Sequence, residues 1–300
     1  MAAQIIANGV ISGCVLALVA LAFGIVYGGL RILHIALGAS YTAAAYFYQI
    51  ARALVTQPGR EPNAVQILTS ISLALFGAVV LSLLIEATIY RPLYNRNAPP
   101  LVTFLASLGA YLVTVNMIGL LFGDETKMLS PFEMASPFHL GGLVLSQMQA
   151  LQICLSLGLV ASFFLLLHKT SLGRNIRALS DNPVLYGVFG YDMPRTRLMV
   201  FSLSALLAGS ASLLKAADVG TNPQVGLSAV LSGAVAVMIG AVNSFWGVLA
   251  GALLLGIAQN AVIYYFSAEW SDAATFAVLI VVLAFRRDGL FAPTLRAEER

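Results

Sequence analysis

Residues 169–197 read KTSLGRNIRALSDNPVLYGVFGYDMPRTR, a polar and basic segment in a chain that is otherwise mostly apolar. Its charged side chains are Lys169, Arg174, Arg177, Arg195 and Arg197 against Asp181 and Asp192. Apolar stretches long enough to cross a bilayer flank the segment on both sides. Loops rich in Lys and Arg beside membrane spans stay in the cytoplasm, so this segment is predicted to be cytoplasmic. Its length and helical patterning predict contact with a soluble partner.

The composition is that of a membrane protein. Of the 300 residues, 59% are hydrophobic and only 10% are charged, whereas about a quarter of a soluble domain is charged. The formal charge of +3 comes from loops beside predicted spans, so it reflects membrane topology and not nucleic-acid binding. Cys14 and Cys154 lie inside apolar runs, and His34, His139 and His168 are scattered. We therefore predict no disulfide, metal site or cofactor.

Nine apolar stretches approach the roughly 20 residues that a transmembrane helix needs. They are Ile5–Tyr27, Leu33–Leu54, Val65–Tyr90, Leu101–Phe122, Gln149–His168, Leu198–Ala217, Gly226–Val242, Phe245–Phe266 and Ala273–Phe285. We predict an all-α membrane protein, a polytopic helical bundle of about 8–9 membrane segments, with residues 1–300 forming one transmembrane domain. The first stretch is predicted to be a retained span and not a cleaved signal. Gly226–Val242 is short, so it either crosses the membrane or re-enters and returns.

The loop charges predict that the N-terminus is outside and the C-terminus inside. The basic loops then share one side, with Arg91, Arg96, the 169–197 segment, Arg286 and Arg287. The acidic residues of the other side are Asp124, Glu125, Glu133, Asp218, Glu269 and Asp272. Arg52 and Arg60, in an outer loop with only Glu61, count against this orientation.

Small residues at four-residue spacing predict close helix packing, as in Gly9/Gly13, Gly24/Gly28 and Gly247/Gly251. The dense run Gly233, Gly240, Gly247, Gly251 and Gly256 would suit sliding helices or a narrow pore lining as well. Among polar residues, Asn116, Gln259 and Asn260 fit interhelical hydrogen bonds better than substrate ligands. Glu86 is predicted to be held by Arg91 or by a neighbouring helix. His34 is either a functional group in a span or an ordinary interfacial histidine.

Several motifs resemble those of bacterial ABC importer permeases for branched-chain amino acids, the shorter of the two permease types. Residues 172–188 are similar to the cytoplasmic coupling loop GRAxRAxxxDxxxAxLxGI of that family. Residues 105–109 with Asn116 are similar to LATIGLSLFLQN, and Glu86 with residues 90–93 to ExxxYRPLR. Pro223 and Gly226 fit an N/SPxxG turn, and Arg286 with residues 289–291 fits RPxGLF. The matches follow the family order from end to end.

The chain also departs from the family pattern. The family stretch NFAHG is replaced here by residues 34–38, HIALG, so that His34 stands for Asn and Leu37 for His. Residues 240–244 replace GGxGS, Ser232 replaces a common Lys, and Arg287 replaces the final Pro. If residues 34–38 line the path, as the resemblance implies, the solute or its handling differs from plain leucine. Related permeases serve urea, amides and small organic acids.

The resemblance implies a set of site residues and partners. The coupling residues are Gly173, Arg174, Arg177, Asp181, Asn182, Leu185 and Gly187. The translocation path is assigned to His34, Gly38, Ser107, Gly109, Asn116, Gly240 and Ser244. The implied protein is a permease subunit in the bacterial inner membrane that forms the path with a second permease. The implied partners are two cytoplasmic ABC ATPases and a periplasmic substrate-binding protein.

The residues of the loop can also be weighed without the family. Arg174 and Arg177 would form a basic rim, with Ile176, Leu179, Val184 and Leu185 as apolar anchors for a groove on the ATPase. Asp181 and Asn182, just before Pro183, are predicted to cap a second short helix. The alternative is that the loop lies on anionic membrane lipid.

Two other functions compete with the importer permease. No phosphate-binding G-x-x-x-x-G-K-[ST] loop, H-E-x-x-H motif or Ser/His/Asp spacing occurs, so the chain is predicted not to be an enzyme by itself. An ion-coupled secondary transporter would need ionisable groups deep in its spans, in which this chain is poor. A structural membrane scaffold would explain the small-residue packing but not the patterned loop.

Overall fold

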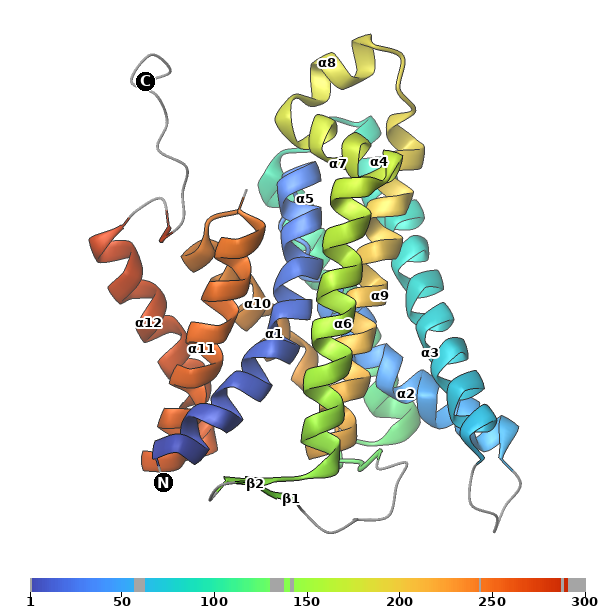
Figure 1. Cartoon of the computed structure of the whole chain (residues 1–300). Helices are drawn as coiled ribbons and strands as arrows, with labels where there is room; N and C mark the ends of the chain where they lie inside the picture. Colours follow the sequence, from blue (N-terminus) through green and yellow to red (C-terminus); the bar gives the residue numbers. More distant parts are fainter. Residues whose placement is uncertain are drawn as a thin grey trace.

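A computed structural model describes residues 2–56, 63–129, 138–140, 143–242, 244–286 and 289–290, which form a helical bundle (Figure 1). The long helices are α1 (Ala2–Leu30), α2 (Leu37–Val55), α3 (Ala64–Ile85), α5 (Pro100–Phe122), α6 (Gln147–Lys169), α9 (Met193–Val219), α10 (Val225–Gly240), α11 (Phe245–Tyr265) and α12 (Ser271–Phe285). The short elements are the π-helical turn η1 (Glu86–Tyr90), α4 (Arg91–Asn95), α7 (Ser171–Asp181), α8 (Pro183–Val188), the 3-10 turn η2 (Ala268–Trp270), β1 (Phe138–Leu140) and β2 (Leu143–Leu145).

Polar residues at the ends of the apolar runs start the helices. Ser146 Oγ accepts the Gln149 N–H at 3.1 Å, and Gln149 Oε1 accepts the Ser146 N–H at 3.1 Å, which closes a capping box on α6. Asp192 caps α9 by accepting the Arg195 N–H at 3.1 Å, and Ser244 caps α11 by accepting the Gly247 N–H at 3.1 Å. These side chains satisfy N–H groups that have no partner inside their own helix.

Within the described residues, seven segments are long and apolar enough to cross a membrane. They correspond to α1, α3 with η1 and α4, α5, α6, α9, α11 and η2 with α12. The other two predicted spans correspond to α2, with 19 residues, and α10, with 16 residues, which lie outside that set. The prediction placed the start of the second span at Leu33. The helix begins at Leu37, so His34 belongs to the non-helical segment before it.

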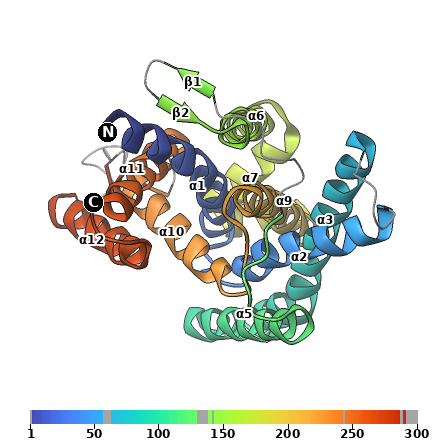
Figure 2. The same cartoon turned by 90° about the horizontal axis from the view of Figure 1, so that it is seen from below.

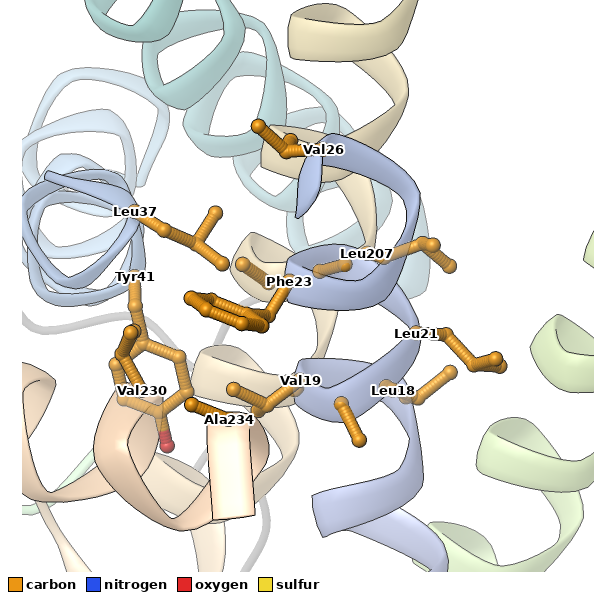
Figure 3. Close-up of a cluster of buried hydrophobic side chains, with 14 of the residues drawn as sticks. Leu18, Val19, Leu21, Phe23, Val26, Leu37, Tyr41, Leu207, Val230 and Ala234 are labelled. Atoms are coloured by element: carbon orange, nitrogen blue, oxygen red, sulfur yellow. The ribbon is translucent and has the colours of Figure 1, made fainter. Parts of the chain in front are cut away.

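Helix α1 runs through the centre of the bundle (Figure 2). In its most apolar stretch 83% of the residues are buried, against 6% for α12, because α12 lies at the periphery. Phe23 of α1 points toward Leu37 and Tyr41 of α2, with Val230 of α10 beside them (Figure 3). This cluster fixes the start of α2 against the central helix.

Glycines bring α11 against α1 and α10. A Cβ on Gly256 would lie 2.5 Å from Gly13 Cα of α1, and a Cβ on Gly240 of α10 would clash with the Gly247 backbone. No side chain fits between these backbones, so the dense glycine run serves helix packing inside the chain. The interpretation of this run as generic packing accounts for the contacts that these residues make.

A glutamine joins the last three long helices. Gln259 Nε2 of α11 donates to Ser232 Oγ of α10 at 3.2 Å and to Thr275 Oγ1 of α12 at 2.8 Å. The prediction of an interhelical hydrogen bond is confirmed for Gln259. It was wrong for Asn260, whose side-chain amide donates to the Gly256 carbonyl of its own helix at 2.9 Å.

The two ends of the bundle differ in charge. The end that carries α4, α7 and α8, here named the basic end, holds Arg91, Arg96, Arg174, Arg177 and Arg195 (Figure 1). The opposite end carries the start of α1, the antiparallel β1–β2 hairpin and the α11–η2–α12 connection, with Glu269 and Asp272. The described loop charges that the sequence assigned to two sides are thus separated along the bundle axis, whereas Arg60, Glu61, Glu133 and Arg287 lie outside the described residues.

Candidate functional site

A buried polar cluster joins the start of α2 to η1 and α5. His34 Nδ1 lies 2.7 Å from the Tyr90 hydroxyl, which donates to Ser107 Oγ at 2.7 Å. Ser107 Oγ also accepts the Ala36 N–H at 2.9 Å. His34, Tyr90 and Ser107 are all fully buried or nearly so. The cluster therefore fixes the non-helical entry to α2 from two other helices.

One ring nitrogen of His34 is left without a partner. Nδ1 contacts the Tyr90 hydroxyl, whereas Nε2 is buried and has no hydrogen-bond partner among the residues that the structure describes. The ring is held edge-on by Phe201 of α9, with centroids 5.0 Å apart. His34 is thus a core residue with one unpaired ring nitrogen.

A buried ion pair lies next to the cluster, at Glu86, which comes four residues before Tyr90 in η1. Arg197 Nη2 of α9 is 3.4 Å from Glu86 Oε1, and each side chain is 5% exposed. The Arg197 guanidinium also stacks over the Tyr94 ring of α4, 4.4 Å from its centroid. Of the two partners that the sequence left open for Glu86, Arg91 and a neighbouring helix, the structure has the neighbouring helix.

Gly38 and Gly226 mark the crossing of α2 and the start of α10. A Cβ on Gly38 would lie 2.8 Å from the Gly226 carbonyl oxygen and 3.0 Å from the Tyr111 ring. The Tyr111 hydroxyl accepts the Leu227 N–H at 3.2 Å, which satisfies one free group at the start of α10. Gly38 follows Ala36, whose N–H bonds Ser107, by two residues, and its role here is to let two backbones approach.

Gly109 and Asn116 lie elsewhere, on the outward face of α5. A Cβ on Gly109 would meet nothing within 4 Å among the described residues, and Asn116 is exposed. The Asn116 amide donates to Leu112 O of its own helix at 2.7 Å, so the predicted interhelical bond is absent from this part of the chain. The same face carries the exposed apolar residues Leu105, Leu112 and Leu120.

Gly240 and Ser244 lie at the connection between α10 and α11. Gly240 is packed against the Gly247 backbone, and Ser244 Oγ accepts the Gly247 N–H at 3.1 Å as the cap of α11. Both residues shape this turn. The seven predicted path residues thus fall in three places, of which the cluster of His34, Ser107 and Gly38 is one.

The segment between α6 and α9 folds as two short helices, as the sequence predicts. Thr170 caps α7, and Gly173 packs so closely on the Leu167 backbone of α6 that a Cβ would clash with its carbonyl. Asn182 Oδ1 accepts the Leu185 N–H at 3.0 Å, and Pro183 is the first residue of α8. The predicted cap of a second short helix is confirmed for Asn182.

The inner face of α7 packs on the bundle. Ile176 and Leu179 are buried, and Ser180 Oγ donates to the Gly28 carbonyl at the end of α1 at 2.7 Å. The prediction that Ile176 and Leu179 are anchors for a partner was wrong, because both side chains are already used inside the chain. Arg174, Arg177 and Asp181 lie on the outer face and are exposed.

An apolar tip follows α7. Leu185, Val188, Phe189 and Tyr191 are large, apolar or aromatic, and between half and three-quarters exposed. Only Leu185 of these was predicted as an anchor from the sequence, and Val184 lies among residues whose side chains the structure does not describe. The missed signal is the turn after α8, where Gly190 has a positive φ of 78° and lets Phe189 and Tyr191 project. Gly187 is exposed on the same tip.

The described residues do not gather metal ligands. No group of three or more His, Cys, Asp or Glu side chains lies together anywhere in the described ranges. The site is therefore a set of packing contacts, one buried polar cluster and one exposed tip.

Comparisons with known proteins agree over nearly the whole chain. Residues 5–283 match the family described as branched-chain amino acid transport system / permease component. The permease protein BraD of the high-affinity branched-chain amino acid transport system of Pseudomonas aeruginosa is 27% identical, over 96% of this chain and 94% of BraD. LivH, the corresponding permease protein of Escherichia coli K12, is 25% identical, over 94% and 93% of the two chains.

A shorter match and a solved structure extend the comparison. The xylose transport system permease protein XylH of Haemophilus influenzae is 31% identical, but over only 31% of this chain and 27% of XylH. The structure of PsaBC from Streptococcus pneumoniae in complex with Fab has a TM-score of 0.53 at 12% identity, covering 97% of this chain and 93% of that chain. At this identity the likeness concerns the fold alone.

Proposed function

This chain belongs to the family of branched-chain amino acid transport permease components, and from that premise we propose how it works as the permease subunit of an ABC importer. It forms a translocation path with a second permease, and two cytoplasmic ATPases drive it. A periplasmic binding protein delivers the solute. The observation that carries the proposal is the exposed apolar tip of Leu185, Val188, Phe189 and Tyr191, presented beside arginines at the basic end.

The tip has the chemistry of a docking element. Exposing apolar side chains of this size to water raises the free energy by about 25 cal/mol per Å² of surface. A groove on a soluble protein would cover them, and the exposed Arg174 and Arg177 would meet an acidic rim. Gly173 and Asn182 contribute by shaping the two helices, and Asp181 and Gly187 lie on the exposed side.

The orientation follows from the charges. With the basic end in the cytoplasm, the N-terminus and the β1–β2 hairpin are outside, in the bacterial inner membrane. The tip then reaches the compartment that holds ATP. The opposite end, with the hairpin, faces the periplasmic binding protein.

The path is assigned to the outward face of α5 and the adjoining entry to α2. A glycine with open space around it and an exposed amide are unusual on a face toward lipid, where apolar side chains are favoured. Gly109 and Asn116 would line the path with the second permease, and Ser107 and His34 would support it from behind. Gly240 and Ser244 contribute through the α10–α11 turn.

The solute class is branched-chain amino acids or related small polar solutes. The names of BraD and LivH support branched-chain amino acids. An ion-coupled transporter is not favoured, because its spans would carry ionisable groups to bind the coupling ion. Here Glu86 and Arg197 neutralise each other at the basic end.

The docking proposal is tested by co-purification from mild-detergent membranes of the native organism. The Phe189→Asp variant places a charge on the tip. Its matched control is Phe266→Asp, at the opposite end, since Phe189 is 75% exposed and Phe266 76%. We expect Phe189→Asp to lower recovery of the ATPase about tenfold, as for loss of one interface anchor, and Phe266→Asp to leave it unchanged.

Two outcomes would contradict the proposal. Equal ATPase recovery with both variants would remove the docking role of the tip. An unmodified chain that is purified without any ATPase or second permease would favour a self-sufficient transporter.

A further inference from the structure

One face of α9 links residues 170–192 between α6 and α9, here named the coupling segment, to the π-helical turn of the third span. Arg197 and Phe201, four residues apart, face Glu86 and Tyr90, which are also four residues apart. The first pair is the 3.4 Å ion contact, and the second brings the Phe201 and Tyr90 rings to 5.2 Å. Ser82 Oγ adds a hydrogen bond to the Phe201 carbonyl at 3.3 Å. A displacement of this part of α9 would therefore act directly on η1.

The start of α9 is in turn fixed to the coupling segment. The hydroxyls of Tyr186 in α8 and Thr196 in α9 lie 2.8 Å apart, next to Arg197 in the chain. The Tyr186 ring stacks on Tyr191 of the exposed tip, with centroids 4.9 Å apart. The Tyr94 hydroxyl of α4 donates to Met193 Sδ at 2.9 Å. The tip, the first turn of α9 and η1 thus form one contiguous set of contacts.

On its other side, η1 contacts the path entry through the Tyr90 side chain, whose ring also meets the His34 ring edge-on with centroids 5.3 Å apart. Tyr90 is the last residue of η1, and its hydroxyl contacts His34 before α2 and Ser107 on α5 at 2.7 Å each. Ser107 lies two residues from Gly109 on the same helix. In a π-helical turn the backbone hydrogen bonds span one residue more than in an α-helix, and such turns occur often at functional positions.

We propose that the Tyr90 hydroxyl is the positioning group through which movement of the coupling segment reaches the entry of α2 and the path face of α5. The inference rests on the proposed function, because it assumes that an ATPase moves the tip. The ion pair of Arg197 with Glu86 and the ring contact with Phe201 carry the movement of α9 to η1. The hydroxyl of Tyr90 carries it from η1 to His34 and Ser107.

Unsatisfied polar atoms at both ends of this contact set support two arrangements. His34 Nε2 and Arg197 Nε are buried and lack a hydrogen-bond partner among the described residues. Each such atom destabilises the observed arrangement relative to one in which it is hydrogen-bonded. An arrangement in which η1 shifts and these atoms find partners would therefore compete with the one observed. An element with two arrangements of similar free energy is what a nucleotide-driven switch requires.

The test uses the complete complex with its ATPases and second permease in proteoliposomes. The permease carries Cys14→Ala, Cys154→Ala and Gly109→Cys, and the Gly109→Cys position has room for a side chain. A small maleimide then reports how ATP with vanadate changes thiol labelling on the path face, without any need to know the solute. Tyr90→Phe removes only the hydroxyl. Tyr46→Phe is the matched control, because Tyr46 is as buried and its hydroxyl has no partner in the described chain.

We expect ATP with vanadate to change the labelling rate about fivefold or more in the parent and in Tyr46→Phe, the lower end of typical coupling between linked sites. Tyr90→Phe should abolish the change while ATP hydrolysis stays within about twofold of the parent. Ser107→Ala, which removes the other partner of the hydroxyl, should abolish the change too, and it replaces Tyr90→Phe as the test if that variant does not fold.

A labelling response in Tyr90→Phe or Ser107→Ala equal to the parent would overturn the inference. So would a parent that hydrolyses ATP but shows no nucleotide-dependent labelling, because the path face would then not respond to the ATPase. A parent complex that recovers no ATPase would instead contradict the proposed function itself.

Discussion

At the scale of single residues, Glu86 and Arg197 form a buried ion pair between two of the described helical elements. The two side chains are 3.4 Å apart at their nearest N and O atoms and are hidden from solvent. Removing one charge leaves the other buried without a counter-charge, whereas removing both leaves an apolar contact. We therefore expect the free energy of unfolding to fall when one charge is removed and to fall less when both are removed.

We predict that Glu86→Leu and Arg197→Leu each destabilise the folded chain by about 3–5 kcal/mol, and that the double variant is more stable than either single variant. The measurement is the midpoint of thermal unfolding in detergent for all four proteins. Additive losses in the double variant would show that the two side chains are not coupled.

The polar cluster could be predicted only in part at this scale. His34 was singled out because a histidine near a membrane span is unusual, and Ser107 through a family motif. Their partner Tyr90 was quoted only as part of a motif at the end of the third span. The bonds join residues 56 and 17 positions apart, and no periodicity in a single sequence relates such positions. The packing of α2, α5 and η1 decides which of these side chains meet.

At the scale of elements, Gly173 and Gly187 separate packing from docking within the coupling segment. A Cβ at position 173 would overlap the Leu167 backbone, which ends α6, whereas a Cβ at position 187 would meet nothing within 4 Å among described atoms. In a helix, replacing Gly by Ala is otherwise favourable by about 1 kcal/mol. The two substitutions are therefore expected to have opposite signs.

We predict that Gly173→Ala lowers the thermal unfolding midpoint of the purified permease and that Gly187→Ala leaves it unchanged or raises it. The α6–α7 turn must open to admit the methyl group in the first variant, while the second only restricts the unfolded chain. Thermal unfolding of both variants in the same detergent is the measurement. A midpoint for Gly173→Ala equal to that of the parent would mean that the turn relaxes freely.

The sequence predicted where α8 begins, but it predicted neither the cap of α7 nor which way the two helices face. Thr170, Asn182 and Pro183 mark the helix starts through local capping, which depends on neighbouring residues alone. Ile176 and Leu179 give α7 an apolar face that would fit a partner groove or the bundle equally well. In the structure this face packs on the bundle, where Ser180 bonds Gly28, a residue 152 positions away in the sequence. Docking then falls to the tip after α8.

At the scale of the whole molecule, the basic and acidic loop residues lie at opposite ends of the helical bundle. The apolar runs, the loop charges and the two helices of the coupling segment could all be predicted from composition and local pattern. The central position of α1 could not, because its apolar composition resembles that of α12 at the periphery. Small residues such as Gly13 opposite Gly256 let α1 approach α11 and take the centre.

The orientation of this axis is open to a direct test. In a background of Cys14→Ala and Cys154→Ala, Val188→Cys places a thiol on the exposed tip at the basic end, and Val144→Cys places one on the β1–β2 hairpin at the opposite end. Both parent side chains are exposed, so a reagent can reach either position.

We predict that a membrane-impermeant maleimide applied to spheroplasts labels the Val144→Cys variant at once. The Val188→Cys variant should be labelled only after the membrane is permeabilised, because positive loops remain in the cytoplasm. The cysteine-free background provides the control for labelling of other groups. The reverse pattern would place the tip outside the cell, where no ATPase could reach it, and the importer mechanism proposed for the coupling segment would then fail.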